Sequence, residues 1–398
     1  MIIIKTKPNE STLKCPSCDV HGSHIEYVFH GIHTSEKFTC KKCKHYFIID
    51  LPIGYSTNCS FQYNVKTRDC RYSNKGAYSW FIKPYLKSLS NPSLKFIKIR
   101  HIKRRKAKNP LILNCMDYLY GHVLLKLLNI ERHLKDNKNL DLVIIIPKSF
   151  LWLVPNGVAE IITIDVSLSQ ALNYYPSISS EINKYISKYD NVHLSKAGFY
   201  PEVSDISIYT KQQSCIKTNY PRISFIWRED RPWINNMYLV YLFKKLKVIN
   251  ILNYVQYLKV ISLFKKLKKT NKDYTYTVTG FGKRFNFPKW IKDGRTKDFT
   301  VEKERELCKI YSESEIVIGI HGSSMLLPSA HAKMTLNLMP MDRLENFAQD
   351  IIYEKKRFNH KLSPIFTHRF LFLNNSISTI AKMANLMIKD SCRIKKKR

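Results

Sequence analysis

Two pairs of cysteines near the N-terminus have the spacing of metal ligands. Cys15-Pro-Ser-Cys18 and Cys40-Lys-Lys-Cys43 are CxxC pairs, and the segment between them, 19–39, predicts strands around a turn. This is the spacing of a zinc ribbon. Four thiolates fill a tetrahedral coordination sphere and leave no position for water, so we expect a structural Zn2+ and no catalytic metal. Redox chemistry at a CxxC pair needs a thioredoxin-like βαβ context, which the segment lacks.

Histidines near these cysteines offer alternative ligands. They are His21, His24, His30, His33 and His45. Because four well-spaced cysteines already complete a tetrahedral site, we expect the histidines to lie at the surface or in turns. A ribbon of this kind either binds nucleic acid or docks against its own enzyme, and the sequence leaves both alternatives open.

Three polar motifs in the second half of the chain each follow an apolar segment. Arg228 and Arg231 follow 222–227, Gly280 and Gly282 follow 274–279, and His321-Gly322-Ser323-Ser324 follows 316–320. The carboxyl ends of parallel strands meet at one edge of a sheet, so these motifs are predicted to converge. Guanidinium forks, glycines that allow close backbone approach, and hydroxyls at a helix N-terminus are groups that bind a diphosphate.

The last of these motifs predicts a strand-to-helix turn. Gly322 allows a sharp turn, Ser323 or Ser324 could cap the following helix, and the amides of the first helical turn are left free to donate. His321 could donate a further hydrogen bond to a phosphate oxygen. The competing interpretation is ordinary turn chemistry with a structural histidine.

The other two motifs have structural interpretations as well. Gly-Phe-Gly lacks the GxGxxG pattern of dinucleotide sites, and the chain contains no GxxxxGK[ST]. Arg228 and Arg231 could be paired with the neighbouring acids Glu229 and Asp230. The predicted diphosphate site therefore depends on the convergence of the three motifs.

The elements that position these residues alternate between strand and helix. Strands are expected at 111–114, 140–146, 160–164, 191–194, 222–227, 274–279, 316–320 and 334–338, and helices at 118–133, 177–188, 238–269 and 301–312. Continuous apolar strands between helices indicate parallel sheets that are covered on both faces. We predict an α/β protein with two tandem Rossmann-like doubly wound domains, preceded by a small zinc ribbon with four cysteine ligands, and a ligand cleft between the two sheets.

The expected domains follow from these patterns. A zinc ribbon covers 1–52, a basic and aromatic connector covers 53–108, a first Rossmann-like domain covers 109–215, and a second covers 220–392 and is followed by a basic tail. A chain of 398 residues is long enough for two cores and a small module.

The charge and the cysteines constrain the partners and the compartment. The net charge is +35, but its basic residues are spread along the chain, with concentrations at 95–108, 244–269 and 393–398. Nucleic acid and an anionic membrane are the partners that such charge attracts, and solvated faces are the structural alternative. No apolar span has membrane length and no signal peptide is recognisable, so we expect a cytoplasmic protein, with the inner membrane face as a peripheral location.

Short motifs resemble a known family of transferases. The stretch ESEIVIGIHGSSMLLPSAHA, followed by TLNLMP, resembles the C-terminal signature of glycosyltransferases similar to glycosyltransferase family 61. The strand ending Trp-Arg-Glu-Asp-Arg is similar to the arginine-bearing strand of that domain, and YGHVLLKLLN lies where such enzymes begin their acceptor domain. The resemblance covers about residues 110–345. Ser-Ser-Met replaces the small residue and Gly-Leu that usually follow His-Gly.

The resemblance implies a GT-B fold and an inverting transfer of sugar from a nucleotide-diphosphate donor to a glycan or lipid-linked acceptor, in surface polysaccharide biosynthesis. Such a reaction needs positive groups around the diphosphate and a general base. The candidates for the base are Asp117 and His122, with helix capping and a structural core histidine as the alternatives. Asp342 or Glu345 could accept a ribose hydroxyl, and Asp342 could equally cap a helix.

Other functions remain open from the sequence. The stretch LFKKLKVINILNYVQYLKVISLFKKLKK either covers the sheet as amphipathic helices or lies on an anionic membrane. The ribbon and the basic residues 95–108 fit a nucleic-acid-binding or nucleic-acid-modifying protein. A degenerate transferase kept as a binding scaffold is the non-enzymatic alternative.

Overall fold

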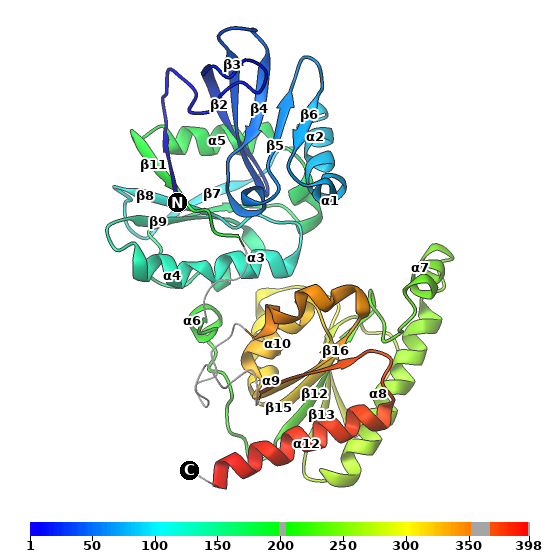
Figure 1. Cartoon of the computed structure of the whole chain (residues 1–398). Helices are drawn as coiled ribbons and strands as arrows, with labels where there is room; N and C mark the ends of the chain where they lie inside the picture. Colours follow the sequence, from blue (N-terminus) through cyan, green and yellow to red (C-terminus); the bar gives the residue numbers. More distant parts are fainter. Residues whose placement is uncertain (199–203, 352–366, 397–398) are drawn as a thin grey trace. The chain divides into compact units, whose positions relative to one another are not determined.

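The computed structural model describes residues 1–198, 204–351 and 367–396. The chain forms two compact units, Met1–Glu202 (unit 1) and Val203–Arg398 (unit 2), each with its own central sheet (Figure 1). Unit 1 combines a mixed sheet, an antiparallel sheet and a cluster of four cysteines, and unit 2 has a parallel sheet. The predicted α/β class is therefore confirmed.

The central sheet of unit 1 has the strand order β1-β11-β8-β9-β10-β7. These strands are β1 (Ile2–Lys5), β11 (Asn191–Leu194), β8 (Pro110–Asn114), β9 (Asp141–Pro147), β10 (Glu160–Ile164) and β7 (Ile99–Lys103). The four inner strands are parallel, and the edge strands β1 and β7 pair antiparallel to them. The inner strands match the apolar runs of the sequence, because a strand covered on both faces is apolar throughout.

Helices cover both faces of this sheet (Figure 1). On one side lie α3 (Tyr120–Leu127) and α4 (Asn129–Asp136), into which the single expected helix 118–133 is divided. On the other side, α5 (Pro176–Ile186) packs against the antiparallel sheet. There, the Ser179 hydroxyl accepts a hydrogen bond from the amide of Phe29 at 3.1 Å, and Asn183 donates to the carbonyl of Tyr27 at 2.6 Å.

The antiparallel sheet extends well beyond the predicted ribbon. Its order is β2-β3-β4-β5-β6, with β2 (Gly22–His30), β3 (His33–Cys40), β4 (Tyr46–Asp50), β5 (Phe61–Asn64) and β6 (Cys70–Tyr72). The segment 53–108 was expected to be a connector, but it supplies β5, β6, α1 (Lys75–Ala77), α2 (Lys83–Ser90) and β7. Strands of three to five residues are too short for a recognisable period, and they form because Phe61, Phe81 and Tyr85 share one core.

A buried polar network joins this sheet to the residues that follow it. His33 Nδ1 lies 2.8 Å from Asp50 Oδ2, and the Ser35 hydroxyl donates to Asp50 Oδ1 at 2.6 Å. The hydroxyls of Ser35 and Tyr85 are 2.8 Å apart. Burial, together with the negative charge of Asp50, raises the pKa of Tyr85, so its hydroxyl stays protonated. The network holds β3 and β4 against α2.

The sheet of unit 2 is parallel throughout, with the order β14-β13-β12-β15-β16-β17. Its strands are β14 (Ile291–Thr296), β13 (Thr275–Phe281), β12 (Arg222–Arg228), β15 (Ser314–Ile320), β16 (Met334–Met339) and β17 (His368–Phe372). The strands β14 and β17 were not predicted. Their sequences, IKDGRT and HRFLF, contain charged residues because both strands lie at an edge of the sheet.

Among its described residues, unit 2 has the α-helices α7 (Met237–Lys245), α8 (Asn250–Thr270), α9 (Val301–Ser312), α10 (Leu326–His331) and α12 (Ile377–Lys396), and a single turn, α6 (Ser207–Thr210), precedes them. Figure 1 shows α8 and α12 against one face of the sheet and α9 and α10 against the other. Within the described residues, no helix has both the length and the apolar character needed to cross a bilayer. The side chains of the basic tail, 393–398, lie outside the described part of the chain.

Each central sheet has one place where the chain changes direction. In unit 2, β13 and β14 lie on one side of β12, whereas β15, β16 and β17 lie on the other. In unit 1, β9 and β10 lie on one side of β8 and β11 on the other. Loops diverge from the carboxyl ends of two such neighbouring strands, which is where open α/β sheets bind their ligands.

Candidate active site and metal centre

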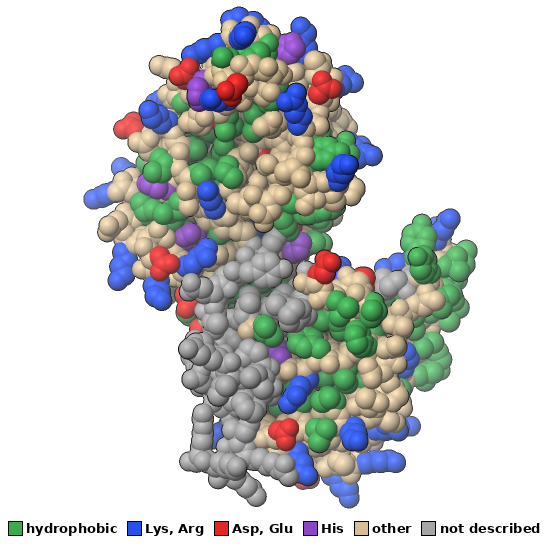
Figure 2. Space-filling model, in the orientation of Figure 1, with side chains coloured by type: hydrophobic (Ala, Val, Ile, Leu, Met, Phe, Trp, Pro, Cys, Tyr) green, Lys and Arg blue, Asp and Glu red, His purple; other side chains and the backbone are tan. Residues whose placement is uncertain are grey.

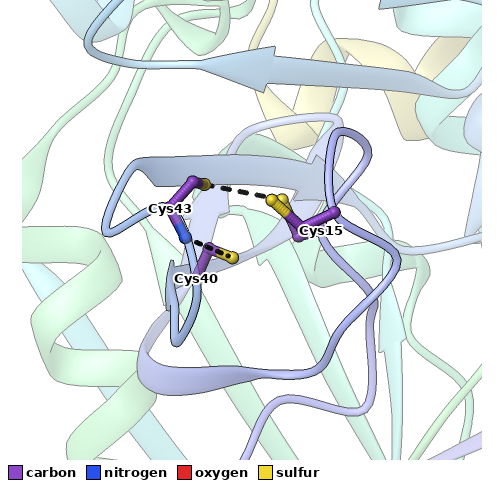
Figure 3. Close-up of side chains that lie close together, drawn as sticks. Cys15, Cys40 and Cys43 are labelled. Atoms are coloured by element: carbon purple, nitrogen blue, oxygen red, sulfur yellow. Dashed lines mark hydrogen bonds between the residues drawn. The ribbon is translucent and has the colours of Figure 1, made fainter.

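The four cysteines predicted to bind metal lie together. The sulfur atoms of Cys15, Cys18, Cys40 and Cys43 are all within 4.8 Å of one another. Figure 3 shows three of them, with Cys15 Sγ and Cys43 Sγ 3.8 Å apart. Cys15 and Cys40 are buried, and the other two are partly exposed. This arrangement could bind a metal ion such as zinc.

Two tight turns place the cysteines. The amide of Asp19 donates to the carbonyl of Cys15 at 2.9 Å, and the amide of Lys44 donates to the carbonyl of Cys40 at 3.0 Å. Both Asp19 and Lys44 have positive φ angles, 54° and 58°, which close the turns after the second cysteine of each pair. The amide of Cys43 then points at Cys40 Sγ, 3.4 Å away. The backbone therefore already donates to sulfur in this arrangement.

The surroundings act differently on the thiols. Burial raises the pKa of Cys15 to about 12. Burial also opposes ionisation of Cys40, but hydrogen bonds from the amides of Cys43 and Lys42 outweigh it and lower the pKa of Cys40 to about 7. A bound cation favours the thiolate form of all four cysteines.

The neighbouring histidines have other partners. His21 Nδ1 lies 2.9 Å from the carbonyl oxygen of Ser11, His24 Nδ1 lies 2.9 Å from Glu36 Oε1, and His45 Nδ1 lies 3.0 Å from Asn64 Nδ2. His30 and His33 were expected at the surface or in turns; they flank the turn between β2 and β3, but their side chains are buried. Their imidazoles pack among aromatic rings, such as those of Tyr85 and Phe81.

In unit 1, the candidate bases Asp117 and His122 lie together, after the carboxyl end of β8. Asp117 Oδ1 is 3.4 Å from His122 Nδ1. Two further residues join them: the ammonium of Lys126 lies 3.0 Å from Asp117 Oδ2, and the hydroxyl of Tyr55 lies 2.6 Å from His122 Nδ1. We refer to Tyr55, Asp117, His122 and Lys126 as the Asp117 cluster.

The members of the Asp117 cluster differ in accessibility. The side chain of Asp117 is fully buried, that of Lys126 is 3% exposed, and that of His122 is 31% exposed. Burial by itself disfavours the carboxylate, but Lys126 and His122 outweigh it and lower the pKa of Asp117. Asp117 is thus an ionised, paired group inside the protein, whereas a substrate could reach His122.

Only part of this cluster could be recognised from the sequence. Lys126 lies one helical turn after His122, so their shared face was visible as an i, i+4 spacing. Tyr55 comes from η1 (Gly54–Thr57), far away in the sequence, and no local pattern marks it. Asp117 does not cap the helix, which was its alternative role. The N-cap residue of α3 is Leu119, and Asp117 Oδ1 accepts a hydrogen bond from the amide of Leu119 at 3.1 Å, before the first helical turn.

In unit 2, Arg228 and Ser324 meet where the chain changes direction. Arg228 ends β12 and Ser324 follows β15, and Arg228 Nη1 donates to Ser324 Oγ at 3.3 Å. Gly322 lies between that strand and the serine, with a φ of 144°. A Cβ atom at Gly322 would lie only 3.3 Å from Arg228 Nη1, so glycine leaves room for the guanidinium.

Acidic residues pair with the arginines at this edge. Arg228 Nε donates to Asp230 Oδ1 at 3.0 Å, and Arg231 Nη2 donates to Asp342 Oδ2 at 2.6 Å. Burial opposes ionisation of Asp230, but the guanidinium of Arg228 outweighs burial and lowers the pKa of Asp230. The alternative of pairing with the neighbouring acids is therefore found for Arg228, whereas Arg231 pairs with Asp342 and Glu229 pairs with Arg284. An incoming phosphate would compete with Asp230 for Arg228.

Gly280, within β13, and Gly282, just after it, serve the packing of the protein itself. Gly280 and Gly282 have φ angles of 106° and 109°. A Cβ atom at Gly280 would lie 2.3 Å from the carbonyl oxygen of Trp227, and one at Gly282 would lie 2.3 Å from Cδ of Glu229. The close approach expected for a ligand is made here by the neighbouring strand and loop.

The turn after β15 differs from the expected helix cap. The residues Ser323–Met325 form a 3-10 turn (η5) with Gly322 at its N-cap and no side-chain cap, so neither Ser323 nor Ser324 caps a helix. The helix that follows, α10, has only six residues, which gives little dipole. It ends early because the chain must enter β16.

His321 lies beneath this turn, away from solvent. Its side chain is fully buried, with Nδ1 3.3 Å from Asn337 Oδ1 and the ring 5.9 Å from that of Phe370. This placement favours the structural role over the role of a direct phosphate donor. Asp342 lies in η6 (Met341–Asp350), with its side chain 45% exposed.

An apolar pocket of about 230 Å3 lies at the carboxyl ends of β16 and β17, close in sequence to Asp342. It is lined by Met339, Leu344, Phe370, Leu371 and Phe372. The carboxyl ends of these strands thus carry positive, negative and apolar side chains.

No protein-family model, no curated protein and no solved structure matches this chain.

Proposed function

We propose that this protein is a GT-B-type glycosyltransferase that moves a sugar from a nucleotide-diphosphate donor to a glycan or lipid-linked acceptor, without a catalytic metal. The observation that carries the proposal is the contact between Arg228 and Ser324 where the parallel sheet of unit 2 changes direction. Counted along the chain, the strands of that sheet have the order 3-2-1-4-5-6. This is the order of Rossmann sheets that bind dinucleotides, which supports a Rossmann-like unit 2.

The donor site that we propose uses the positive groups of this edge. The planar fork of Arg228 matches two phosphate oxygens, and its fixed charge would stabilise the nucleoside diphosphate as it leaves. Asp342, which Arg231 holds in place, would accept a hydrogen bond from a ribose hydroxyl of the donor nucleotide. The apolar pocket between Met339 and Phe372 suits a nucleobase.

In unit 1, we assign the base to His122 rather than Asp117. A base must reach the proton of the acceptor hydroxyl, and His122 is the more exposed of the two. Asp117 and Lys126 then act as positioning residues, because their buried ion pair fixes the start of α3 and the imidazole at its first turn.

The metal of the four-cysteine cluster is zinc in this proposal, and its role is structural. Four thiolates hold the two turns together and leave no position for a substrate. The remaining described cysteines, Cys59, Cys70, Cys115, Cys215 and Cys308, are also free thiols. Free thiols fit a reducing compartment, so we place the enzyme in the cytoplasm.

Nucleotide binding tests the proposal. UDP-, GDP-, ADP- and CMP-sugars are screened by thermal shift, and we expect one class to raise the melting temperature. Arg228→Ala should then raise the Kd of that nucleotide about a hundredfold, because charge-assisted hydrogen bonds to phosphate are lost. Arg305→Ala, an exposed arginine on α9, is the matched control and should leave the Kd unchanged. An unchanged Kd in Arg228→Ala would exclude this donor site.

Asp230 provides a test in the opposite direction. Asp230→Asn removes the carboxylate that competes for Arg228, so the same nucleotide should bind several-fold more tightly. Isothermal titration calorimetry measures the Kd, and Asp273→Asn, at an exposed position before β13, serves as the control. Weaker binding by Asp230→Asn would mean instead that Asp230 holds Arg228 in place for the ligand.

The alternative of a nucleic-acid-binding protein has less support from the structure. Within the basic residues 95–108, Arg105 pairs with Asp141 at 3.1 Å, and Arg104 donates to the carbonyl of Val154 at 3.3 Å. The same segment contains β7, an edge strand of the central sheet. Part of this charge therefore serves the fold of unit 1.

A further inference from the structure

Helix α7 carries apolar side chains that face solvent. Tyr238 is 88% exposed, Tyr241 69% and Leu246, just after the helix, 59%. Others follow through the start of α8, and the whole set, which we call the α7 surface, is Tyr238, Leu239, Tyr241, Leu242, Leu246, Val248 and Ile251. Figure 2 shows apolar side chains gathered over this end of unit 2. Val240 is the one buried residue among the described side chains of α7.

The two helices of this segment behave differently. In α8, Val260, Leu263 and Leu267 are fully buried against the sheet, as expected of an amphipathic helix that covers it. The α7 surface precedes that part, across a turn at Lys247 with a φ of 58°. The prediction that these helices cover the sheet is therefore confirmed for α8, whereas α7 leaves most of its apolar side chains exposed.

Lysines lie beside the α7 surface, and the nearest acidic residue in sequence, Asp230, is close enough to Lys244 for the lysine to help lower its pKa. Lys244, Lys245 and Lys247 are exposed beside the apolar residues, and no acidic residue occurs between Asp230 and Asp273. Leucine and isoleucine enter the acyl region of a bilayer, tyrosine prefers its interface, and lysine reaches anionic headgroups. A nucleic acid would bury none of the apolar side chains. An anionic bilayer complements both the apolar groups and the charges.

We propose that the α7 surface binds the face of an anionic lipid bilayer. The proposal does not depend on the transferase activity, because it concerns an exposed helix outside the donor-binding residues. It also bears on that activity, because α8 is fixed to the strand end that carries Arg228. Gln256 donates to the carbonyl of Arg228 at 2.9 Å and accepts from the amide of Trp233 at 2.9 Å. A chain docked through α7 thus holds the edge with Arg228 near the lipid, which suits a lipid-linked acceptor.

Vesicle flotation of the full chain tests this inference. We expect the chain to float with vesicles that contain roughly one-third phosphatidylglycerol, and much less with pure phosphatidylcholine. Binding should weaken as salt is raised, because the lysines are exposed to solvent. A chain that does not float with the anionic vesicles at low salt would overturn the proposal.

Matched variants separate the apolar and the charged contributions. Tyr241→Ser/Leu242→Ser should lower the partition coefficient at least about tenfold, because two side chains no longer enter the bilayer. Lys244→Gln/Lys245→Gln/Lys247→Gln should lower it about a hundredfold on anionic vesicles only. The control is Leu94→Ser/Phe96→Ser, which changes two apolar residues that are 89% and 86% exposed elsewhere, and its partition coefficient should match that of the wild type.

Two further measurements distinguish a bilayer from a second copy of the chain as the partner of the α7 surface. Sedimentation without lipid should show no self-association through the α7 surface; a dimer that Tyr241→Ser/Leu242→Ser converts to monomer would assign the surface to a second copy and overturn the proposal. Nucleotide binding by that variant should equal that of the wild type. Loss of flotation with intact nucleotide binding therefore tests the membrane inference alone, and loss of nucleotide binding in Arg228→Ala tests the donor site alone.

Discussion

Replacing Cys40 by serine is expected to release the bound metal and to unfold the end of the antiparallel sheet that carries the cysteines. The core there consists of Phe38, Phe47 and Ile49 packed around the cysteines, too small a set to hold the turns alone. We expect the free energy of unfolding of unit 1 to fall by about 5 kcal/mol or more, because loss of a structural metal is among the largest single-site effects. Metal content by mass spectrometry and denaturant unfolding followed by circular dichroism measure both results.

A matched control separates the metal from a general effect of losing a thiol. Cys59→Ser and Cys70→Ser alter partly buried cysteines of the same unit that lie outside the cluster. Both should bind as much metal per chain as the wild type and keep most of its stability. A Cys40→Ser chain with undiminished metal and an unchanged unfolding curve would show that the cluster is not a structural metal site.

Replacing His122 by alanine is expected to lower the rate of sugar transfer by about two to four orders of magnitude, the usual contribution of a general base. The side chain is partly exposed, so the free energy of unfolding should change by about 1 kcal/mol or less. The measurement is release of nucleotide from the sugar nucleotide that stabilises the wild type. Its Kd should not change, because the proposed donor site consists of residues of unit 2.

Asp117→Asn should chiefly lower the free energy of unfolding, whereas His122→Ala chiefly lowers the rate of transfer. The buried ammonium of Lys126 loses its counter-charge, which costs about 3–5 kcal/mol of stability. The control for His122→Ala is His101→Ala, which removes the imidazole of a partly exposed histidine elsewhere in unit 1 and should leave the transfer rate unchanged. Full transfer activity in a folded His122→Ala chain would exclude His122 as the base.

The sequence predicted the elements and sites that depend on neighbouring residues. The CxxC spacing was enough to predict the four-cysteine cluster, because each tight turn places its own pair of sulfurs and the hairpin of β2 and β3, in which Gly22 pairs with Cys40, brings the two pairs together. The bounds of β10 (Glu160–Ile164) and β11 (Asn191–Leu194) were predicted to the residue. All five residues of β10 are buried, and a strand covered on both faces is largely apolar. Strands β14 and β17 were missed because edge strands carry charges and show no uninterrupted apolar run.

Only the tertiary structure decided which of the predicted residues meet. Tyr55 reaches His122 because η1 and α3, distant in sequence, lie beside one another in unit 1. Gly280 and Gly282 proved to accommodate Trp227 and Glu229, which no local pattern reveals. The exposure of apolar side chains likewise depends on packing. Both α7 and α8 are rich in leucine, tyrosine and lysine, yet only α8 packs against the sheet. Local sequence sets what each segment can form, whereas strand order and packing determine which side chains are brought into contact.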